Sequence, residues 1–153
     1  NKSEKSALPE IWEVHEIMET RKTLVYVSFG THIKVSKDGL AHLIQDLKAV
    51  PTDNFLVILR LNIALDEAML VRSNSRIEKL GEQHGIPPNM IVHHKFFPQR
   101  ELFAQFTDRM VFVSSCGAGS CIKAIRASVP IVGWPAGSEQ GSHSERLAQA
   151  GVA

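Results

Sequence analysis

The segment from Met110 to Gln140, MVFVSSCGAGSCIKAIRASVPIVGWPAGSEQ, contains residue types that suit the binding of a phosphate. A β-branched run ends in SSCGAGS, and a helical pattern follows at once. Small residues in such a turn let backbone N–H groups point at an anion beside the positive end of a helix. The turn lacks the Lys of a P-loop and the full dinucleotide fingerprint, so it does not by itself identify the phosphate. The segment continues through a second strand into a Pro-led loop that ends in Glu139 and Gln140.

Two other segments follow apolar runs with residues that can contact a ligand. SFGTH contains Gly30, which permits close approach of the backbone, and Thr31, which offers a hydroxyl. HHKFFPQREL places Phe96 and Phe97 beside a proline and the amide of Gln99. Each segment also has a purely structural interpretation, because a glycine can simply turn the chain and phenylalanines are more often core residues than platforms for a base.

The sequence favours neither a metal site nor a serine hydrolase. His93 and His94 are typical of a strand end, and the other histidines, at positions 15, 32, 42, 84 and 143, are scattered. The serines of the SSCGAGS turn have no evident His and Asp partners, and no G-x-S-x-G elbow is present. Cys116 and Cys121 are the only cysteines, and their separation suits neither a disulfide framework nor a zinc site. We therefore expect no metal and a reduced pair of thiols.

Composition predicts one soluble globular domain. The 153 residues are 44% hydrophobic and 22% charged, which is enough for a real core. With 17 Lys and Arg against 16 Asp and Glu, the net charge of +1 gives no field that favours nucleic acid or an anionic membrane. The apolar runs are too short to cross a bilayer, and the first residues have no signal-peptide core. We expect a linker or edge helix from an upstream domain in residues 1–22, and the domain itself in 23–153.

Alternation of short apolar runs with helical patterns predicts an α/β fold with a doubly wound, Rossmann-like parallel sheet. The predicted strands are Leu24–Phe29, Phe55–Leu61, Met90–His94, Arg109–Ser114 and Pro130–Trp134. Helical spacing of apolar residues predicts helices in SKDGLAHLIQDLKAV and in LDEAMLVRSNSRIEKLGEQHG. Strands that are nearly continuously apolar are buried on both faces, so helices should cover each side of the sheet. In such folds ligands bind beyond the carboxyl ends of the strands, where the segments above lie.

Four blocks of the sequence, taken in order, resemble the C-terminal donor-binding domain of the family 1 UDP-glycosyltransferases, the C-terminal half of a GT-B fold. They are VYVSFGT, KFFPQRELF, VFVSSCGAGSCIKA and VPIVGWPAGSEQ, followed by AQAGVA. The last three blocks of the family usually read like KWxPQxxLL, FVTHxGxNSxxEA and GVPxxxxPxxxDQ. The resemblance runs from about Leu8 to Ala153.

The resemblance implies inverting transfer of a hexosyl group from a UDP-sugar to a small or lipophilic acceptor. The UDP-sugar is the donor substrate, and no metal or other cofactor is implied. The general base of the family is a His in an N-terminal, acceptor-binding domain, which this chain does not resemble. That domain of the same protein is therefore the expected partner, and we expect the isolated donor domain to transfer nothing. The acceptor, the sugar and the compartment, cytoplasmic or associated with the endoplasmic reticulum, stay open.

The resemblance also implies donor-binding roles for individual residues. Phe96 occupies the place of the Trp that stacks on uracil, and Gln99 matches an amide near the base and ribose. Thr31 and Ser120 match positions whose hydroxyls and backbone meet the diphosphate, and Gly117 keeps the turn open in front of the helix. Gly30 belongs to the same donor-binding set. Glu139 and Gln140 match the pair that receives the sugar hydroxyls, as an acceptor and a two-way amide can.

Three positions depart from the family pattern. Ser115 stands in place of a His that faces the diphosphate, and a hydroxyl carries no positive charge. Gly119 replaces an Asn, and Lys123 replaces a Glu that accepts bonds from the ribose. The lysine either reaches a phosphate, selects another nucleotide, or marks a degenerate, non-catalytic nucleotide-binding or regulatory domain of the same fold. A related epimerase or cell-wall glycosyltransferase fits the spacing of the blocks less well.

Overall fold

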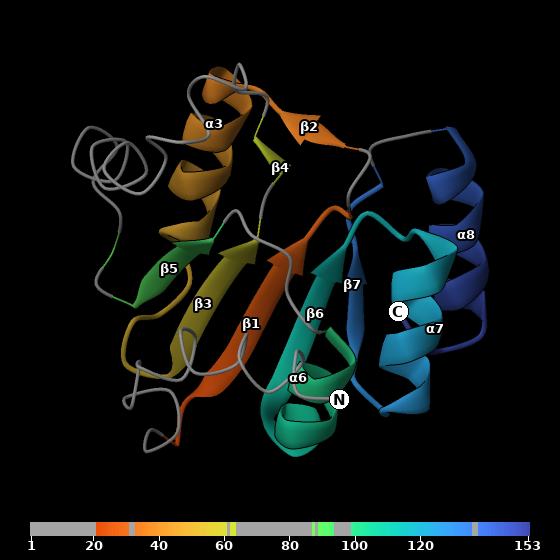
Figure 1. Ribbon diagram of the computed structural model, residues 1–153. Coiled ribbons are helices and arrows are strands. Elements are labelled where there is room, and N and C mark those ends of the chain that lie inside the picture. The colour runs from red at the N-terminus through yellow and green to blue at the C-terminus, as the bar shows by residue number, and fades with distance from the viewer. Residues whose placement is uncertain are drawn as a thin grey trace, which may run out of the picture.

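The computed structural model describes residues 21–30, 33–60, 62–63, 87, 89–93, 99–135 and 138–153. Its centre is a parallel sheet of five strands in the order β5-β3-β1-β6-β7 (Figure 1). These strands are β1 (Thr23–Ser28), β3 (Phe55–Arg60), β5 (Met90–His93), β6 (Met110–Ser114) and β7 (Ile131–Gly133). Two short strands, β2 (Lys34–Val35) and β4 (Asn62–Ile63), pair separately in parallel. All five predicted strands of the main sheet are confirmed.

Helices pack on both faces of the sheet, as the sequence predicted. They are α3 (Lys37–Leu47), α6 (Gln99–Phe106), α7 (Ala118–Arg126) and α8 (Ser138–Gln149), with a short 3-10 turn, η1 (Thr107–Arg109). Helix α3 packs against one face through its buried apolar residues, and α6 and α7 pack against the other. None of the described helices combines the length and the apolar character that a membrane crossing requires. The doubly wound α/β architecture is thus confirmed.

The alternation of side chains along the strands divides the core in two. Tyr26 pairs in register with Ile58 and Phe112, and all three belong to the core on the α6 and α7 side. Val27, one position along, pairs with Leu59 and belongs to the core under α3. Because successive side chains of a strand point to opposite faces, a strand buried on both sides reads as a continuous apolar run.

The last register position of the sheet is polar. It crosses four neighbouring strands through His93, Arg60, Ser28 and Ser114 and ends at Gly133. The positions just before it are apolar in every strand. The sheet therefore presents polar groups at its carboxyl edge, the edge at which doubly wound folds bind ligands.

Some predicted boundaries differ from those of the structure. Arg109 lies in η1 and not in a strand, and its guanidinium sits over the ring of Phe106, 5.0 Å from the centroid. Ser36 caps α3 by accepting a hydrogen bond from the Gly39 N–H at 3.1 Å, so the first predicted helix begins where its sequence indicates. The second predicted helix, between residues 65 and 85, and most of residues 1–22 lie outside the described residues.

Candidate functional site

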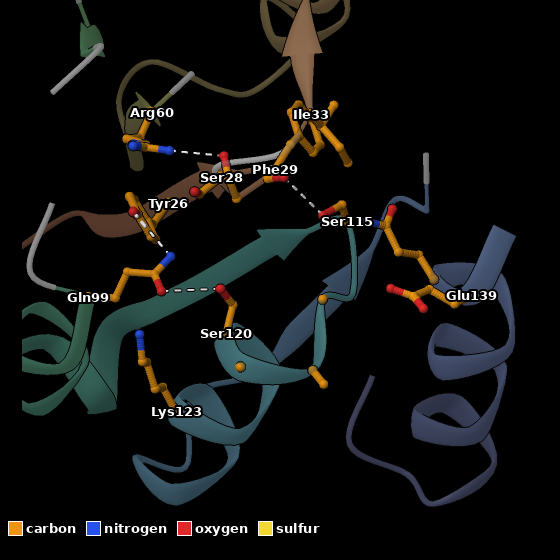
Figure 2. A pocket seen from close by; sticks show the side chains of 15 residues that line it. Tyr26, Ser28, Phe29, Ile33, Arg60, Gln99, Ser115, Ser120, Lys123 and Glu139 are labelled. Atoms are coloured by element: carbon orange, nitrogen blue, oxygen red, sulfur yellow. Dashed lines mark hydrogen bonds between the residues drawn. The ribbon is translucent and has the colours of Figure 1, made fainter. Parts of the chain in front are cut away.

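A cavity of about 440 Å³ opens at the carboxyl edge of the sheet (Figure 2). Eleven residues were predicted to bind a donor, and two of them, Thr31 and Phe96, lie outside the described residues. The other nine all line this one cavity: Gly30, Gln99, Ser115, Gly117, Gly119, Ser120, Lys123, Glu139 and Gln140. Residues from four separate parts of the sequence thus meet around one space.

The turn between β6 and α7 forms one wall of the cavity. Cys116 has a left-handed backbone, with φ of 65°, an arrangement that is uncommon outside glycine. The Oγ of buried Ser114 accepts a hydrogen bond from the Cys116 N–H at 3.1 Å and so holds this turn. Gly117 is the N-cap of α7 and supplies no side-chain hydrogen bond to the first turn. The N–H groups at this helix start are therefore suited to an anion.

Ser115, which stands where the family has a His, is directed at the protein itself. Its hydroxyl donates to the carbonyl of Phe29 at 3.2 Å, and its side chain is buried. The bond ties the turn after β6 to the loop after β1. Ser115 therefore contributes structure to the cavity wall, and the positive charge that a His can carry is missing at this position.

A chain of hydrogen bonds crosses the cavity from α7 to β1. Ser120 donates to Oε1 of Gln99 at 3.2 Å, and Nε2 of Gln99 donates to the hydroxyl of Tyr26 over a long 3.5 Å. Burial raises the pKa of the Tyr26 phenol above its ordinary value, so this hydroxyl stays protonated at neutral pH. The three side chains orient one another, and Gln99 fixes the start of α6 against α7 (Figure 2).

Charges around the cavity are separated by sign. Arg60, from β3, and Lys123, from α7, lie toward one end, and Glu139, from the first turn of α8, lies toward the other (Figure 2). Arg60 is only 8% exposed, and its Nη1 donates to the carbonyl of Gly30 at 3.0 Å. Glu139 was expected at the end of a loop, but it lies one residue inside a helix. A ligand with an anionic part and a hydroxyl-rich part matches this arrangement.

Two curated relatives match nearly the whole chain. UDP-glycosyltransferase stmC of Aspergillus ustus is 27% identical over 148 residues, which are 90% of this chain and 27% of that protein. UDP-glucose flavonoid 3-O-glucosyltransferase 7 of Fragaria ananassa is 26% identical over 147 residues, which are 94% of this chain and 28% of that protein. The chain is related to the UDP-glycosyltransferases. It spans little more than a quarter of the length of these relatives, and no protein-family model matches it.

Solved glycosyltransferases share the fold. TcCGT1 in complex with UDP superposes with a TM-score of 0.66 at 20% identity, over 91% of this chain and 31% of that one. UGT89C1 of Arabidopsis thaliana, also complexed with UDP, superposes with a TM-score of 0.65 at 16% identity, over 92% of this chain and 30% of that one. These similarities place this chain in the Rossmann-like α/β architecture that the sequence resemblance implied.

Sequence reasoning missed several residues that line the cavity of this chain. They are Tyr26, Ser28, Phe29, Ile33, Arg60 and Ala118. Four of them lie in or just after strands, inside runs that were interpreted as core. Arg60, at the end of the apolar run FLVILR, could have indicated a site, because arginine is rarely buried unless it has a partner.

His143 was set aside in the sequence as one of the scattered histidines, but the structure gives it a position next to the site. Its Nδ1 lies 3.3 Å from the carbonyl oxygen of Cys116, so the ring joins α8 to the left-handed turn. Glu139 and Gln140 lie one turn earlier on the same helix. His143 thereby helps to hold the acid-amide pair beside the turn.

The two thiols are free and buried, as expected for a reduced pair. Burial raises the pKa of Cys121 to about 11, so this thiol stays protonated and unreactive at neutral pH. Among the residues that the structure describes, no three His, Cys, Asp or Glu side chains are grouped closely enough to hold a metal ion.

Gly133 of β7 lies directly against Ser144 of α8 and against Cys116. A Cβ at this position would overlap Oγ of Ser144 and lie 3.1 Å from Sγ of Cys116. We expect Gly133→Ala to lower the free energy of unfolding by about 1–3 kcal/mol, because the side chains of Ser144 and Cys116 must shift to admit the methyl group. Urea denaturation measures the loss. Adding Ser144→Ala removes the worst overlap and should recover part of it; a double variant as unstable as the single one would contradict this account.

Proposed function

We propose that this chain is the donor-binding domain of an inverting glycosyltransferase that uses a UDP-sugar and transfers a hexosyl group to a small or lipophilic acceptor. The observation that carries the proposal is the meeting of nine predicted donor residues around one cavity with charges separated by sign. The relatedness to UDP-glycosyltransferases supports UDP as the nucleotide.

The proposed donor lies along the cavity. Its diphosphate faces the start of α7, where the helix dipole and the N–H groups attract negative charge. Lys123 lies further along the same helix, on the side of Gln99, and adds a full positive charge to the cavity. The ribose and base extend toward Gln99, with Phe96 as the proposed stacking partner. The sugar reaches Glu139 and Gln140, which together can accept and donate hydrogen bonds.

In this proposal the domain contributes to catalysis by stabilising the leaving group. The acceptor oxygen attacks the anomeric carbon, the bond from that carbon to the β-phosphate oxygen breaks, and UDP leaves with the electron pair. Fixed N–H groups at the turn around Gly117 then stabilise the charge that grows on the phosphate. The base that takes the acceptor proton is proposed to come from an N-terminal acceptor-binding domain of the same protein. This chain alone is accordingly expected to bind the donor without transferring its sugar.

Glu139→Ala tests the proposed sugar end. We expect the variant to bind UDP as the parent chain does and to bind UDP-glucose about tenfold more weakly, because hydrogen bonds to a carboxylate are charge-assisted. Calorimetry with both ligands measures the difference. Glu145→Ala, an exposed change on the same helix outside the cavity, is the matched control. Equal losses for UDP and UDP-glucose would place Glu139 away from the sugar.

A second candidate is a non-catalytic nucleotide-binding or regulatory domain of the same fold. It is favoured by Ser115, whose hydroxyl bonds to Phe29 instead of facing a ligand, and by the charge reversal at Lys123. Titration of the folded chain with UDP and UDP-glucose discriminates between the two. Preference for UDP-glucose over UDP supports the donor domain, whereas binding that ignores the sugar, or fails, favours the second candidate.

A further inference from the structure

Ser28 carries a buried hydroxyl that completes no well-formed hydrogen bond within the fold. The residue is 2% exposed and lines the cavity, and its Oγ is the only buried side-chain nitrogen or oxygen among the described residues without a hydrogen bond of normal length and angle. The Tyr26 phenol lies close enough for the Ser28 hydroxyl to lower the pKa of Tyr26, against the larger effect of burial. Burying a hydroxyl without a well-formed hydrogen bond lowers stability. Its position at the cavity suggests that a ligand atom completes the bond.

Arg60 lies next to Ser28 on the neighbouring strand. The two residues pair in register at the carboxyl edge of the sheet, and in a parallel pair such residues extend from the same face. Arg60 also lines the cavity and is held by the carbonyl of Gly30, which has a left-handed φ of 77°. A guanidinium that is fixed and largely buried keeps its charge and strengthens hydrogen bonds made beside it.

On its other side, Ser28 neighbours the strand that leads into the proposed phosphate-binding turn. Ser114 of β6 pairs with Ser28 on the side away from Arg60, and the turn that leads into α7 follows Ser114 directly. Ser28 and the residues at the start of α7 line the same cavity, so a diphosphate, which carries oxygens along its length, can contact both in the proposed complex. Ser115, by contrast, offers this space neither charge nor a free hydroxyl hydrogen.

We infer that Ser28 and Arg60 form a second phosphate-binding element, on the sheet side of the cavity, which supplies the positive charge that Ser115 cannot. The inference rests on the proposed donor-binding function. Ser28 donates its hydroxyl hydrogen to a phosphate oxygen of the donor, and Arg60 stabilises that oxygen by its charge. Arginine forms strong, charge-assisted hydrogen bonds with phosphate and with carboxylate, and of these two groups the proposed UDP-sugar donor carries phosphate.

Ser28→Ala tests this element with little risk to the fold. We expect UDP affinity of the 153-residue chain to fall about tenfold, the scale of one charge-assisted hydrogen bond. Uridine, which has no phosphate, should bind as before in ligand-observed NMR. The melting temperature should hold or rise, because the variant removes a buried polar group that lacks a well-formed hydrogen bond. Ser142→Ala, which removes an exposed hydroxyl bonded to the Glu139 carbonyl, is the control and should leave UDP binding unchanged.

Arg60→Gln tests the charge. We expect UDP affinity to fall about tenfold to a hundredfold, UMP affinity to fall less, and uridine affinity to stay the same. The UDP affinity of Arg60→Lys should lie between those of Arg60→Gln and the parent chain, because lysine keeps the charge and lacks the planar guanidinium. The control is Arg126→Gln, which removes an exposed charge from the last turn of α7, outside the cavity.

Two results overturn the inference. One is unchanged UDP affinity in both Ser28→Ala and Arg60→Gln, with the parent chain binding UDP; the proposed function then stands and the second phosphate element fails. The other is an equal loss for UDP and uridine, which means that the residues act only by shaping the cavity. A parent chain that binds neither ligand overturns the proposed function itself. Ser28→Ala alone decides the matter if Arg60→Gln does not fold.

Discussion

Lys123→Glu is expected to weaken UDP binding by about tenfold to a hundredfold. Lys123 lines the cavity at the end that also holds Arg60, one turn into the helix whose start faces the proposed diphosphate. Two unit charges 4 Å apart interact by about 1 kcal/mol in water and about 4 kcal/mol at a partly shielded protein surface. Because the substitution replaces an attraction by a repulsion, even a well-solvated contact accounts for a loss of this size. Calorimetric titration with UDP measures it.

The matched control for this reversal is Arg126→Glu. Arg126 is exposed on the same helix and lies outside the cavity, so the two variants change the net charge of the chain equally. Only Lys123→Glu should lose UDP affinity, and its loss should shrink as salt rises because the contact is partly screened. Tighter binding by Lys123→Glu would mean that a ribose contact typical of the family has been restored, and that the native site had decayed.

The sequence predicted the sheet well because buried parallel strands leave a strong signal. Runs such as LVYVSF and FLVILRL are apolar on both faces, and all five of the predicted strands occur. Helices α6 and α8 were not predicted as helices. The first was interpreted only as part of the KFFPQRELF motif. The second, SEQGSHSERLAQ, is polar around most of its circumference and therefore lacks the apolar periodicity by which a helix is identified.

The missed part of the site depends on register, which composition cannot give. Ser28 and Arg60 meet only because β1 and β3 pair in parallel with their last residues opposite each other. A shift of one position would move Arg60 to the other face of the sheet, away from the cavity. Motif comparison instead found residues that lie in loops and on helices, and nine of these line the cavity. The roles of Thr31 and Phe96, outside the described residues, stay predictions.

The support beneath the cavity is an aromatic cluster in the core. The ring of Tyr26 stacks on Phe112, with centroids 5.5 Å apart and planes at 17°, and meets the edge of Phe103 at 6.0 Å. Phe103 and Phe112 lie 5.0 Å apart, and all three side chains are fully buried. Tyr26 is also the residue that receives the hydrogen bond from Gln99 at the cavity. The same side chain thus belongs to the core and to the site.

Phe112→Ala is expected to lower the free energy of unfolding by about 3–5 kcal/mol, the cost of removing a buried ring and leaving a cavity. Urea denaturation measures this loss, and Phe112→Leu should lose less because it fills more of the space. Without its stacking partner the Tyr26 ring is less constrained, so its contact with Gln99, and through Gln99 with Ser120, should loosen. UDP binding should therefore weaken even under conditions in which the variant is fully folded.

Leu43→Ala separates this effect from a general loss of stability. Leu43 is buried on α3, in the core on the opposite face of the sheet, and its removal should cost about 2–5 kcal/mol without touching the cavity. If UDP affinity depends on Tyr26 being held in place, Leu43→Ala binds UDP normally when folded and Phe112→Ala does not. Equal weakening in both variants would show that binding follows overall stability, and that the aromatic cluster has no particular link to the site.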